Sequence, residues 1–326
     1  MVKYIKYRYK EKCFLDYRKI VYEIEEQDAG RTVLSFLKSK GFSARVLGGL
    51  KRNPYGITIG RKRVTVQKQL KKGDTLTVRI ANRESQVDNE HIQPVDIPLT
   101  ILYEDEDVLV VDKPPHLAVH PTLGNRGATL AGAVAFYMKK QNREFVFRPI
   151  HRLDKDTSGV ILLGKNAHSA GVLGEDLKKK KIERTYLAIL EGILPEKDGT
   201  VDAPIARRPG SVLGREVNPS GEQAITHYKV LQEKNGYSLV ALKLDTGRTH
   251  QIRVHMSYLG APVAGDFLYG TEDADLGRHA LHSASLRFTQ PVTGEKLHFI
   301  CPLPEQLKAY LAKHGFEGDF HETFDF

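Results

Sequence analysis

The chain is poor in sulfur and has no tryptophan: 2 cysteines and 3 methionines occur in 326 residues. Cys13 and Cys301 are too few and too far apart to form a disulfide framework or a zinc-binding pattern. No apolar run approaches the ~20 residues that a membrane-spanning helix needs, and the first residues lack the apolar segment of a signal peptide. These absences argue against disulfide-stapled, secreted and membrane classes, and we expect a cytoplasmic protein.

Metal-binding patterns are also missing. The 13 histidines are scattered along the chain. The pairs His250 with His255 and His279 with His282 have no carboxylate or cysteine partners at the spacing that metal sites use. We therefore expect no metal site.

Positive charge is concentrated at one end of the chain. The net charge is +9, yet residues 1–82 carry 20 Lys and Arg against 7 Asp and Glu, which leaves 29 against 33 for all the rest. A basic segment beside a nearly neutral body is typical of a protein that holds a polyanion with one domain and acts with the other. The alternative is a basic surface that is simply solvated.

The basic segment has the pattern of a small α/β domain. Apolar spacing, capping residues and turn residues predict a strand over 21–25, a helix opened by 28–31 and ended by Gly41, a helix over 44–50 capped by Ser43, and strands over 57–59, 64–66 and 75–80. Two short helices before a small basic sheet that ends in Leu-Lys-Lys-Gly-Asp-Thr-Leu-Thr-Val resemble the S4-type RNA-binding domain. The resemblance implies RNA contacts by basic residues of the helices and the following turn: Arg31, Arg45, Lys51, Arg52, Arg61, Lys62 and Arg63.

A polar stretch without any period separates this domain from the rest. We interpret residues 1–82 as an S4-like domain, 83–98 as a linker and 99–326 as a second domain. In the second domain strand follows strand with few crossover helices, which predicts an α+β fold with a mostly antiparallel mixed β-sheet and flanking helices. The expected strands cover 100–103, 108–112, 160–163, 184–192, 224–231, 237–244, 250–256, 280–288 and 296–300, and the expected helices 129–140 and 168–181.

The densest polar stretch is His-Arg-Leu-Asp-Lys-Asp-Thr-Ser-Gly, residues 151–159, directly before the apolar run 160–163. A polar loop at the mouth of a rigid buried strand is a common place for chemistry. The alternative is a solvated turn in which Asp and Ser cap backbone groups.

A second dense stretch is Thr-Gly-Arg-Thr-His-Gln-Ile-Arg-Val-His, residues 246–255. Its alternation predicts a half-buried strand with Ile252, Val254 and Met256 on one face. Thr249, Gln251, Arg253 and His255 then form a polar, partly cationic row on the other. We interpret this row as the wall of a cleft that faces an anionic substrate.

Both stretches resemble motifs of the RNA pseudouridine synthases of the RluA/RluD type, the large family that modifies ribosomal and transfer RNA. The family carries an Asp in the first motif, a Tyr in Lys/Arg-Thr-Tyr-x-Ala-x-x-x-Gly and an Arg in Gly-Arg-x-His-Gln-Ile/Leu-Arg-Val-His. Here these are Asp154, Tyr186 and Arg253. Gly265-Asp266-x-x-Tyr269-Gly270 and Leu281-His282-Ser283 also match. The resemblance covers nearly all of residues 99–305.

The resemblance implies an isomerase that breaks the N1–C1′ bond of uridine, turns the uracil and joins C5 to C1′. Asp154 would act as nucleophile on the sugar or as base on a ribose proton, and the residues leave both routes open. Arg253 would hold that carboxylate, and Tyr186 would stack on the uracil. Arg152, with its neighbour His151, would serve the flipping of the base out of its stack.

Our interpretation is an RNA pseudouridine synthase acting on ribosomal or transfer RNA, with no cofactor, no metal, and no membrane or DNA partner. One alternative is a non-catalytic RNA-binding or ribosome-assembly factor on the same scaffold. Another is a hydrolase using Ser158, His151 and Asp154, although the Gly-x-Ser-x-Gly elbow typical of such enzymes is missing.

Overall fold

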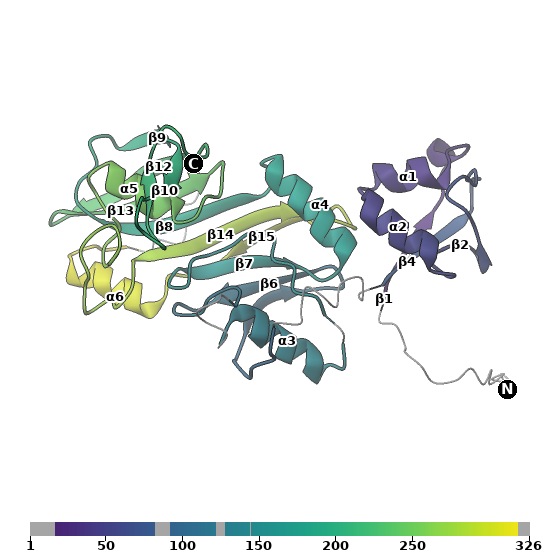
Figure 1. Ribbon diagram of the computed structural model, residues 1–326, viewed down its shortest axis with the longest axis horizontal. Helices are drawn as coiled ribbons and strands as arrows, with labels where there is room; N and C mark the ends of the chain where they lie inside the picture. The colour runs from purple at the N-terminus through teal and green to yellow at the C-terminus, as the bar shows by residue number, and fades with distance from the viewer. Residues whose placement is uncertain (1–16, 82–91, 122–127, 144, 319–326) are drawn as a thin grey trace.

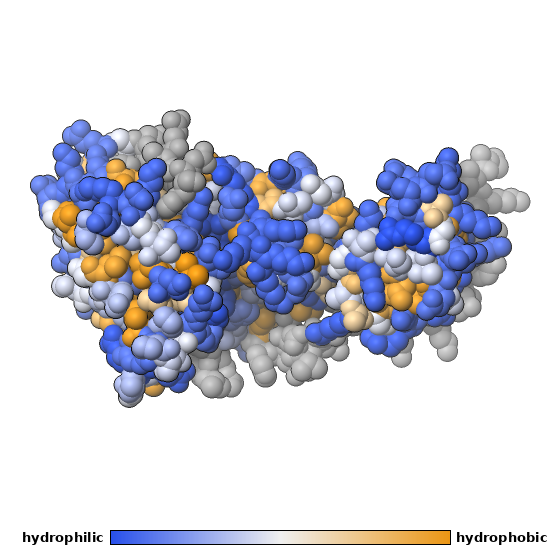
Figure 2. Space-filling view, turned by 90° about the horizontal axis from the view of Figure 1, so that it is seen from above, coloured by the Kyte–Doolittle hydropathy of each residue, from blue (hydrophilic) through white to orange (hydrophobic). Residues whose placement is uncertain are grey.

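The computed structural model describes residues 17–81, 92–121, 128–143 and 145–318, which form two lobes (Figure 1). The N-terminal lobe (residues 17–81) and the C-terminal lobe (residues 92–318) have separate β-sheets and separate hydrophobic cores. Seen from above, the lobes meet at a narrow waist, and most of the visible surface is hydrophilic (Figure 2). Cys13 lies outside the described residues.

The N-terminal lobe packs two helices on one antiparallel sheet of order β1-β4-β2-β3. Its core includes Phe36, Leu37, Leu47, Leu76 and Val78. Its elements are β1 (Tyr17–Glu23), a 3-10 turn (Glu26–Asp28), α1 (Val33–Ser39), α2 (Ala44–Arg52), β2 (Ile57–Ile59), β3 (Lys62–Arg63) and β4 (Thr75–Ala81).

The predicted cap of the second helix is confirmed, because Ser43 Oγ accepts a hydrogen bond of 3.3 Å from Val46 N. The first helix starts later than expected. Thr32 caps it through a 3.1 Å bond from Ser35 N, while residues 26–28 form only a 3-10 turn.

The predicted strand over 64–66 is wrong. Gly60, with φ of +55°, turns the chain directly after β2, so that Lys62 already pairs with Ile59. The chain then leaves the sheet, and the Val66 carbonyl accepts a hydrogen bond from Leu34 N at the start of α1. Val64 and Val66 therefore connect the sheet to α1 and do not form a strand of their own.

The C-terminal lobe is built on a nine-stranded sheet of order β5-β6-β7-β14-β8-β13-β12-β9, with β15 paired to β14. Only the β7–β14 pair is parallel, which confirms the predicted mostly antiparallel α+β architecture. The strands are β5 (Thr100–Glu104), β6 (Val108–Lys113), β7 (Ser158–Gly164), β8 (Glu183–Glu191), β9 (Asp198–Asp202), β12 (Ile225–Lys234), β13 (Tyr237–Leu244), β14 (Leu281–Thr289) and β15 (Lys296–Ile300).

Helices and a small hairpin surround this sheet. They are α3 (Leu130–Lys140), α4 (Ala167–Lys178), α5 (Gln251–Tyr258), α6 (Glu305–Lys313) and the hairpin of β10 (Ile205–Arg207) with β11 (Arg215–Val217). In the part of the chain that the structure describes, none of the helices has the length and apolar character needed to cross a membrane.

The strand predicted over residues 250–256 is wrong, because this stretch is helix α5. Every residue from Gln251 to Met256 is buried. Its polar side chains meet buried partners: His255, for example, bonds Thr226 Oγ1 at 2.8 Å and the Ala203 carbonyl at 2.9 Å. A helix that is buried all round has no apolar stripe of period 3.6, so the alternation of residue types imitated a strand.

Strand β7 fixes the position of the motif that precedes it. All of its residues are buried, with Ile161 and Leu163 in the core on one face of the sheet and Val160 and Leu162 in the core on the other. Gly159 has a φ of +108°, and a Cβ added there would lie 2.2 Å from the Ser283 carbonyl oxygen. Glycine is therefore required where the loop enters the sheet.

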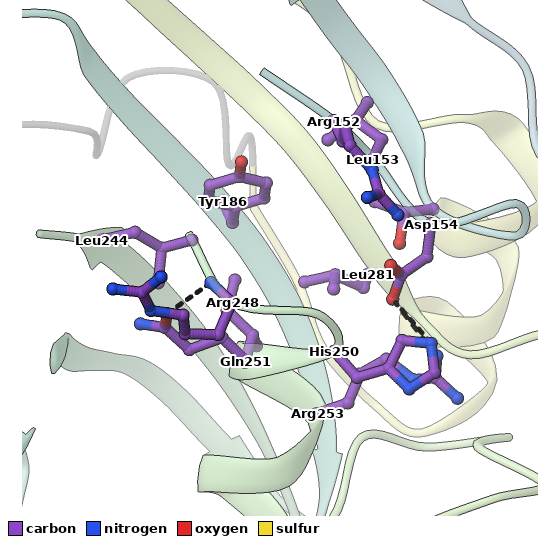
Figure 3. Close-up of a pocket in the computed structure, with 12 residues that line it drawn as sticks. Arg152, Leu153, Asp154, Tyr186, Leu244, Arg248, His250, Gln251, Arg253 and Leu281 are labelled. Atoms are coloured by element: carbon purple, nitrogen blue, oxygen red, sulfur yellow. Dashed lines mark hydrogen bonds and ion pairs between the residues drawn. The ribbon is translucent and has the colours of Figure 1, made fainter. Parts of the chain in front are cut away.

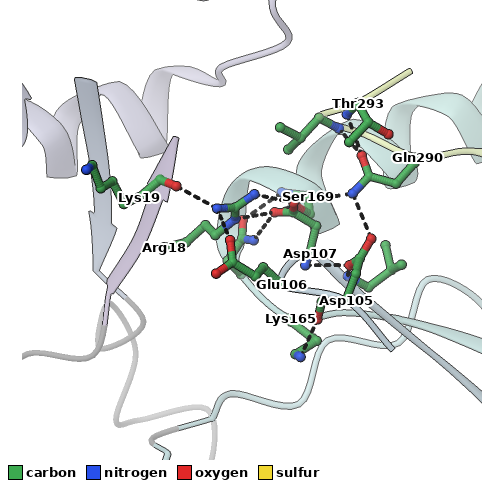
Figure 4. A network of polar contacts seen from close by, with 12 residues as sticks. Arg18, Lys19, Asp105, Glu106, Asp107, Lys165, Ser169, Gln290 and Thr293 are labelled. Carbon is green, nitrogen blue, oxygen red and sulfur yellow. Dashed lines mark hydrogen bonds and ion pairs between the residues drawn. The ribbon is translucent and has the colours of Figure 1, made fainter. Parts of the chain in front are cut away.

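A partly buried ion pair connects the two lobes (Figure 4). Arg18 of β1 donates from Nε and Nη2 to the two carboxylate oxygens of Asp107, at 3.0 and 2.8 Å. Asp107 is 1 % exposed and also accepts hydrogen bonds from Asn166 and Ser169. Burial acts to raise the pKa of Asp107, but the hydrogen bond and charge of Arg18 outweigh it, and the pKa is lowered.

Apolar contacts complete the junction between the lobes. The rings of Phe42 and His168 stack with centroids 3.9 Å apart, and burial lowers the pKa of His168 to about 4. A neutral imidazole therefore packs on the phenyl ring. Val292 of the C-terminal lobe packs against the core of the N-terminal lobe.

Replacing Arg18 by Ala should loosen this junction. Asp107 would keep its donors within the C-terminal lobe, so that lobe should still fold, while the contact between lobes should lose about 1–3 kcal/mol. The radius of gyration measured by small-angle X-ray scattering should rise. Lys72→Ala is the control, because it breaks an ion pair with Glu26 whose side chains are 70 % and 76 % exposed. Identical scattering from Arg18→Ala and the control would contradict the expectation.

Candidate active site

The loop of residues 151–157, which we call the motif loop, is held to the fold at three successive residues. The Lys113 ammonium donates to the Lys155 carbonyl at 3.0 Å. The Arg278 guanidinium donates to the Asp156 carbonyl at 3.1 Å. The Thr157 hydroxyl bonds His279 Nε2 at 2.8 Å. A loop fixed in this way holds the preceding residue, Asp154, in one place.

Lys113 is a fully buried lysine at the end of β6. Its Nζ also donates to the carbonyls of Pro114 and Leu117, at 2.8 and 2.9 Å. Burial lowers its pKa to about 7, against the attraction of Asp156 and Asp154. Three carbonyl acceptors match the three protons of an ammonium group, so the geometry favours the charged form.

Asp154 projects from the motif loop toward helix α5, where it meets Arg253 (Figure 3). Arg253 Nη1 donates to Asp154 Oδ2 at 3.1 Å. The Asp154 side chain is 24 % exposed, whereas that of Arg253 is 4 % exposed. The carboxylate therefore faces a cavity while the guanidinium behind it is buried.

Arg253 is itself fixed by a second carboxylate. Its Nε and Nη2 donate to the oxygens of Asp266 at 2.6 and 2.8 Å, and the Asp266 side chain is fully buried. Burial acts to lower the pKa of Arg253, but its hydrogen bonds and the charges of Asp266 and Asp154 raise it. Such a bidentate pair leaves one edge of the guanidinium for Asp154.

His250 and Tyr269 close the side of the site next to Arg253. His250 Nε2 lies 4.0 Å from Asp154 Oδ2, and its Nδ1 bonds the Tyr269 hydroxyl at 2.8 Å. The Arg253 guanidinium lies over the Tyr269 ring, 5.0 Å from its centroid. Burial lowers the pKa of His250 despite the nearby Asp154, which leaves the imidazole neutral at neutral pH.

Tyr186 lies across the pocket from Asp154 (Figure 3). It sits on β8 and is 4 % exposed. Burial raises its pKa, so the phenol keeps its proton. Together with Leu244, Ile252 and Leu281 it gives the narrow pocket next to Asp154, of about 50 Å³, an apolar wall.

Arg152 is exposed and lines this narrow pocket. It also lines a cavity of about 640 Å³ that opens beside it. Arg152 therefore stands where the pocket meets the surface.

His151 and Ser158 are not among the residues that line the pocket or the neighbouring cavity. Ser158 Oγ is buried and bonds His282 Nδ1 at 2.9 Å. His151 is buried, and its Nε2 accepts a 3.3 Å hydrogen bond from Leu162 N of β7. The hydrolase alternative, which needs Ser158 beside His151, has no basis in this arrangement, and His151 is not placed to touch a displaced base.

The burial of His151 predicts an acid-sensitive fold. Burial and the charge of Arg184 lower its pKa from 6.5 to about 3. Between these pH values the unfolded chain takes up a proton that the folded chain does not, so the free energy of unfolding should fall as the pH falls, by about 1.4 kcal/mol per pH unit. His151→Gln should remove this part of the slope, as measured by urea unfolding between pH 7 and 5. A slope equal to that of the wild type would contradict it.

The predicted RNA-binding residues are found in two places in the N-terminal lobe. Most are exposed on α2 and on the turn into β3, which are tied together by a 3.0 Å bond from Arg63 to the Lys51 carbonyl. Arg31 instead pairs with Asp28 and reaches Ser39. The lobe also has a cavity of about 650 Å³ with a basic lining. Its cationic residues are Lys62, Arg63, Lys68 and Lys71.

Sequence reasoning missed the residues that support the site: Lys113, His250, Asp266, Arg278 and His279. Asp266 was visible only as part of the family-like stretch 265–270, and Lys113 directly follows the strand expected over 108–112. Among the described residues, no group of three or more His, Cys, Asp or Glu side chains is arranged to hold a metal ion.

Comparison with known proteins identifies the family to which the chain belongs. Residues 107–258 match the profile of the RNA pseudouridylate synthase family. The chain is 40 % identical to the uncharacterized RNA pseudouridine synthase YjbO of Bacillus subtilis (strain 168), over 85 % of this chain and 96 % of that one. It is 40 % identical to ribosomal large subunit pseudouridine synthase D of Xanthomonas campestris pv. campestris, over 74 % of this chain and 76 % of that one.

A solved structure, human RNA pseudouridylate synthase domain containing 1, is similar with a TM-score of 0.53 and 27 % identity, over 68 % of this chain and 96 % of that one. The identity and coverage of the two sequence relatives are sufficient to assign the family. The chain belongs to the RNA pseudouridine synthases.

Proposed function

We propose that this enzyme isomerises specific uridines of ribosomal RNA, with Asp154 as the catalytic carboxylate. The observation that carries the proposal is a partly exposed carboxylate held by a buried guanidinium, opposite an aromatic ring. Ribosomal RNA is favoured because ribosomal large subunit synthases are among the relatives of about this identity.

The reaction begins when the target uridine leaves its stack and enters the narrow pocket. Arg152, at the pocket mouth, fills the space that the base vacates. The uracil then lies between Asp154 and the Tyr186 ring, within an apolar wall that excludes water.

Asp154 next acts on the ribose, as nucleophile at C1′ or as base on a ribose proton, and the N1–C1′ bond breaks. The uracil turns and C5 joins C1′, which displaces Asp154 from C1′ on the first route and is accompanied by return of the proton from Asp154 to the ribose on the second. The proton of C5 is then lost to solvent, while N1 gains one. Arg253 keeps the carboxylate aimed at the sugar throughout. Because two hydrogen bonds to Asp266 fix the Arg253 guanidinium, it cannot readily turn from Asp154 toward another anion.

The N-terminal lobe serves as an S4-like RNA-binding domain in this proposal. Its support is the cluster of exposed cations on α2, on the turn into β3 and in the neighbouring basic cavity. Cations on a rigid surface bind the phosphate backbone regardless of sequence. The lobe would thus provide affinity, while the pocket selects the nucleotide.

The test is release of tritium from C5-labelled uridine in unmodified ribosomal and transfer RNA, followed by mapping of the modified positions. We expect release from ribosomal RNA at a small number of sites. Release from transfer RNA alone would show that transfer RNA, and not ribosomal RNA, is the substrate. No release from either pool, with RNA binding intact, would favour the non-catalytic assembly factor.

A further inference from the structure

The junction between the lobes and the motif loop lie at opposite ends of the same two strands. Strand β6 starts directly after Asp107 and ends at Lys113, which holds the Lys155 carbonyl of the motif loop. Strand β7 runs antiparallel to it, from the end of the motif loop to Gly164, which pairs with Val108. A strand of seven residues spans about 20 Å, and all of β7 is buried. The core therefore fixes the distance from the junction to the active site.

Asp107 also ties together the parts of the C-terminal lobe that face the junction. Its carboxylate accepts hydrogen bonds from Asn166 and Ser169 at the start of α4, at 2.8 and 2.9 Å. It accepts another, of 3.3 Å, from Gln290 in the turn between β14 and β15. Gln290 Oε1 in turn accepts a 2.5 Å bond from N of Val292, which packs on the core of the N-terminal lobe. The surface that meets the N-terminal lobe is thus held by the C-terminal lobe itself.

A second contact adds to the ion pair of Arg18. The turn between α1 and α2 packs on α4, which stands between the large sheet and the N-terminal lobe (Figure 1). A Cβ added to Gly41 in this turn would lie 2.7 Å from Val172 Cγ2 of α4, next to the stacked rings of Phe42 and His168. Lobes joined by one chain segment move relative to each other unless contacts fix them. Two separate contacts, on β1 and on this turn, oppose rotation about either one.

The cations of the N-terminal lobe take their orientation from this junction. Helix α2 starts two residues after Phe42, and its Arg45, Lys51 and Arg52 are exposed. Arg63, on the turn into β3, bonds the Lys51 carbonyl at 3.0 Å, so the cations of that turn move together with α2. RNA phosphates bound by these cations are therefore held at a set distance and angle from the active site.

We propose that Arg18 determines which uridine is modified. By holding the N-terminal lobe against Asp107, it restricts the enzyme to the uridine at one distance from the RNA helix that this lobe binds. The inference rests on the proposed function, since it needs RNA on the N-terminal lobe and a uridine in the pocket. Cations bind phosphates regardless of sequence, so a loosely attached lobe would add affinity without distinguishing one uridine from another. Arg18 is thus a positioning residue that acts through Asp107.

The experiment starts from a structured RNA that the wild type modifies. A few base pairs are inserted or removed between the modified uridine and the segment that the N-terminal lobe protects from hydroxyl-radical cleavage. In the wild type, kcat/KM should fall by at least about tenfold at altered spacing, because the bound phosphates then hold the uridine away from the pocket. In Arg18→Ala the same changes should alter kcat/KM by less than about threefold. Arg18→Lys, which keeps one charge for Asp107, should lie between the two.

Lys72→Ala is the control, because it removes one cation of the same lobe from an exposed ion pair with Glu26 and should keep the wild-type dependence on spacing. A variant that only folds less well would lower kcat/KM equally at all spacings. An optimum as sharp in Arg18→Ala as in the wild type, or no optimum in the wild type, would overturn the inference. Absence of pseudouridine formation by the wild type, or of RNA protection by the N-terminal lobe, would instead overturn the proposed function.

Discussion

Asp154→Asn should lower the rate of pseudouridine formation by at least about 10³-fold, because an amide is neither a nucleophile nor a base at neutral pH. The substitution keeps the size of the side chain and an oxygen that can accept the 3.1 Å hydrogen bond from Arg253 Nη1. The pocket should therefore keep its shape, and RNA affinity should change little. Single-turnover release of C5 tritium, with a separate binding titration, measures the two effects.

Asp156→Asn is the matched control in the same loop. Its carboxylate bonds the exposed His116 ring at 2.9 Å instead of the buried guanidinium, so turnover should stay within about tenfold of the wild type. An Asp154→Asn enzyme as active as the Asp156→Asn enzyme would disprove the assigned role of Asp154.

The parts of the fold that could be predicted are those where local pattern and tertiary structure agree. The run before Gly164 predicted a buried strand, and β7 is buried on both faces of the sheet. Ser43 was predicted to cap a helix and does so, and the helix predicted over 129–140 is α3, which Thr129 caps. The loop at the mouth of β7 predicted a site because such loops commonly carry chemistry, and the resemblance of its sequence to a family motif favoured that interpretation over a solvated turn.

The parts that could not be predicted depend on contacts between distant residues. Lys113 holds the carbonyl of Lys155, 42 residues away, and Arg278 holds the carbonyl of Asp156, 122 residues away. Contacts of this kind leave no periodic pattern in the sequence. Helix α5 was misjudged for the same reason, since its buried polar residues are satisfied by remote partners. Arg253 nevertheless lines the pocket, because the motif names the residue independently of the secondary structure assigned to it.

Arg253→Met should abolish activity and also destabilise the fold by about 3–5 kcal/mol, the usual cost of leaving one partner of a buried ion pair uncompensated. The partner in question is Asp266, whose side chain is fully buried. Arg253→Lys should lose nearly as much activity, because one ammonium cannot reproduce the fork that bonds Asp266 twice and Asp154 once. Urea unfolding measures stability, and tritium release measures turnover.

Stability and catalysis should separate in the double variant Arg253→Met with Asp266→Asn. Asparagine removes the unpaired charge and keeps an oxygen for the backbone N–H groups of Leu268 and Tyr269, which bond Asp266 Oδ1 at 3.0 and 3.2 Å. Much of the lost stability should therefore return. Activity should not return, because no guanidinium then orients the Asp154 carboxylate, although the motif loop still fixes its backbone. If the refolded double variant turned over RNA at the wild-type rate, Arg253 would be only a structural partner of Asp266, and the orientation of Asp154 would have to come from the motif loop alone.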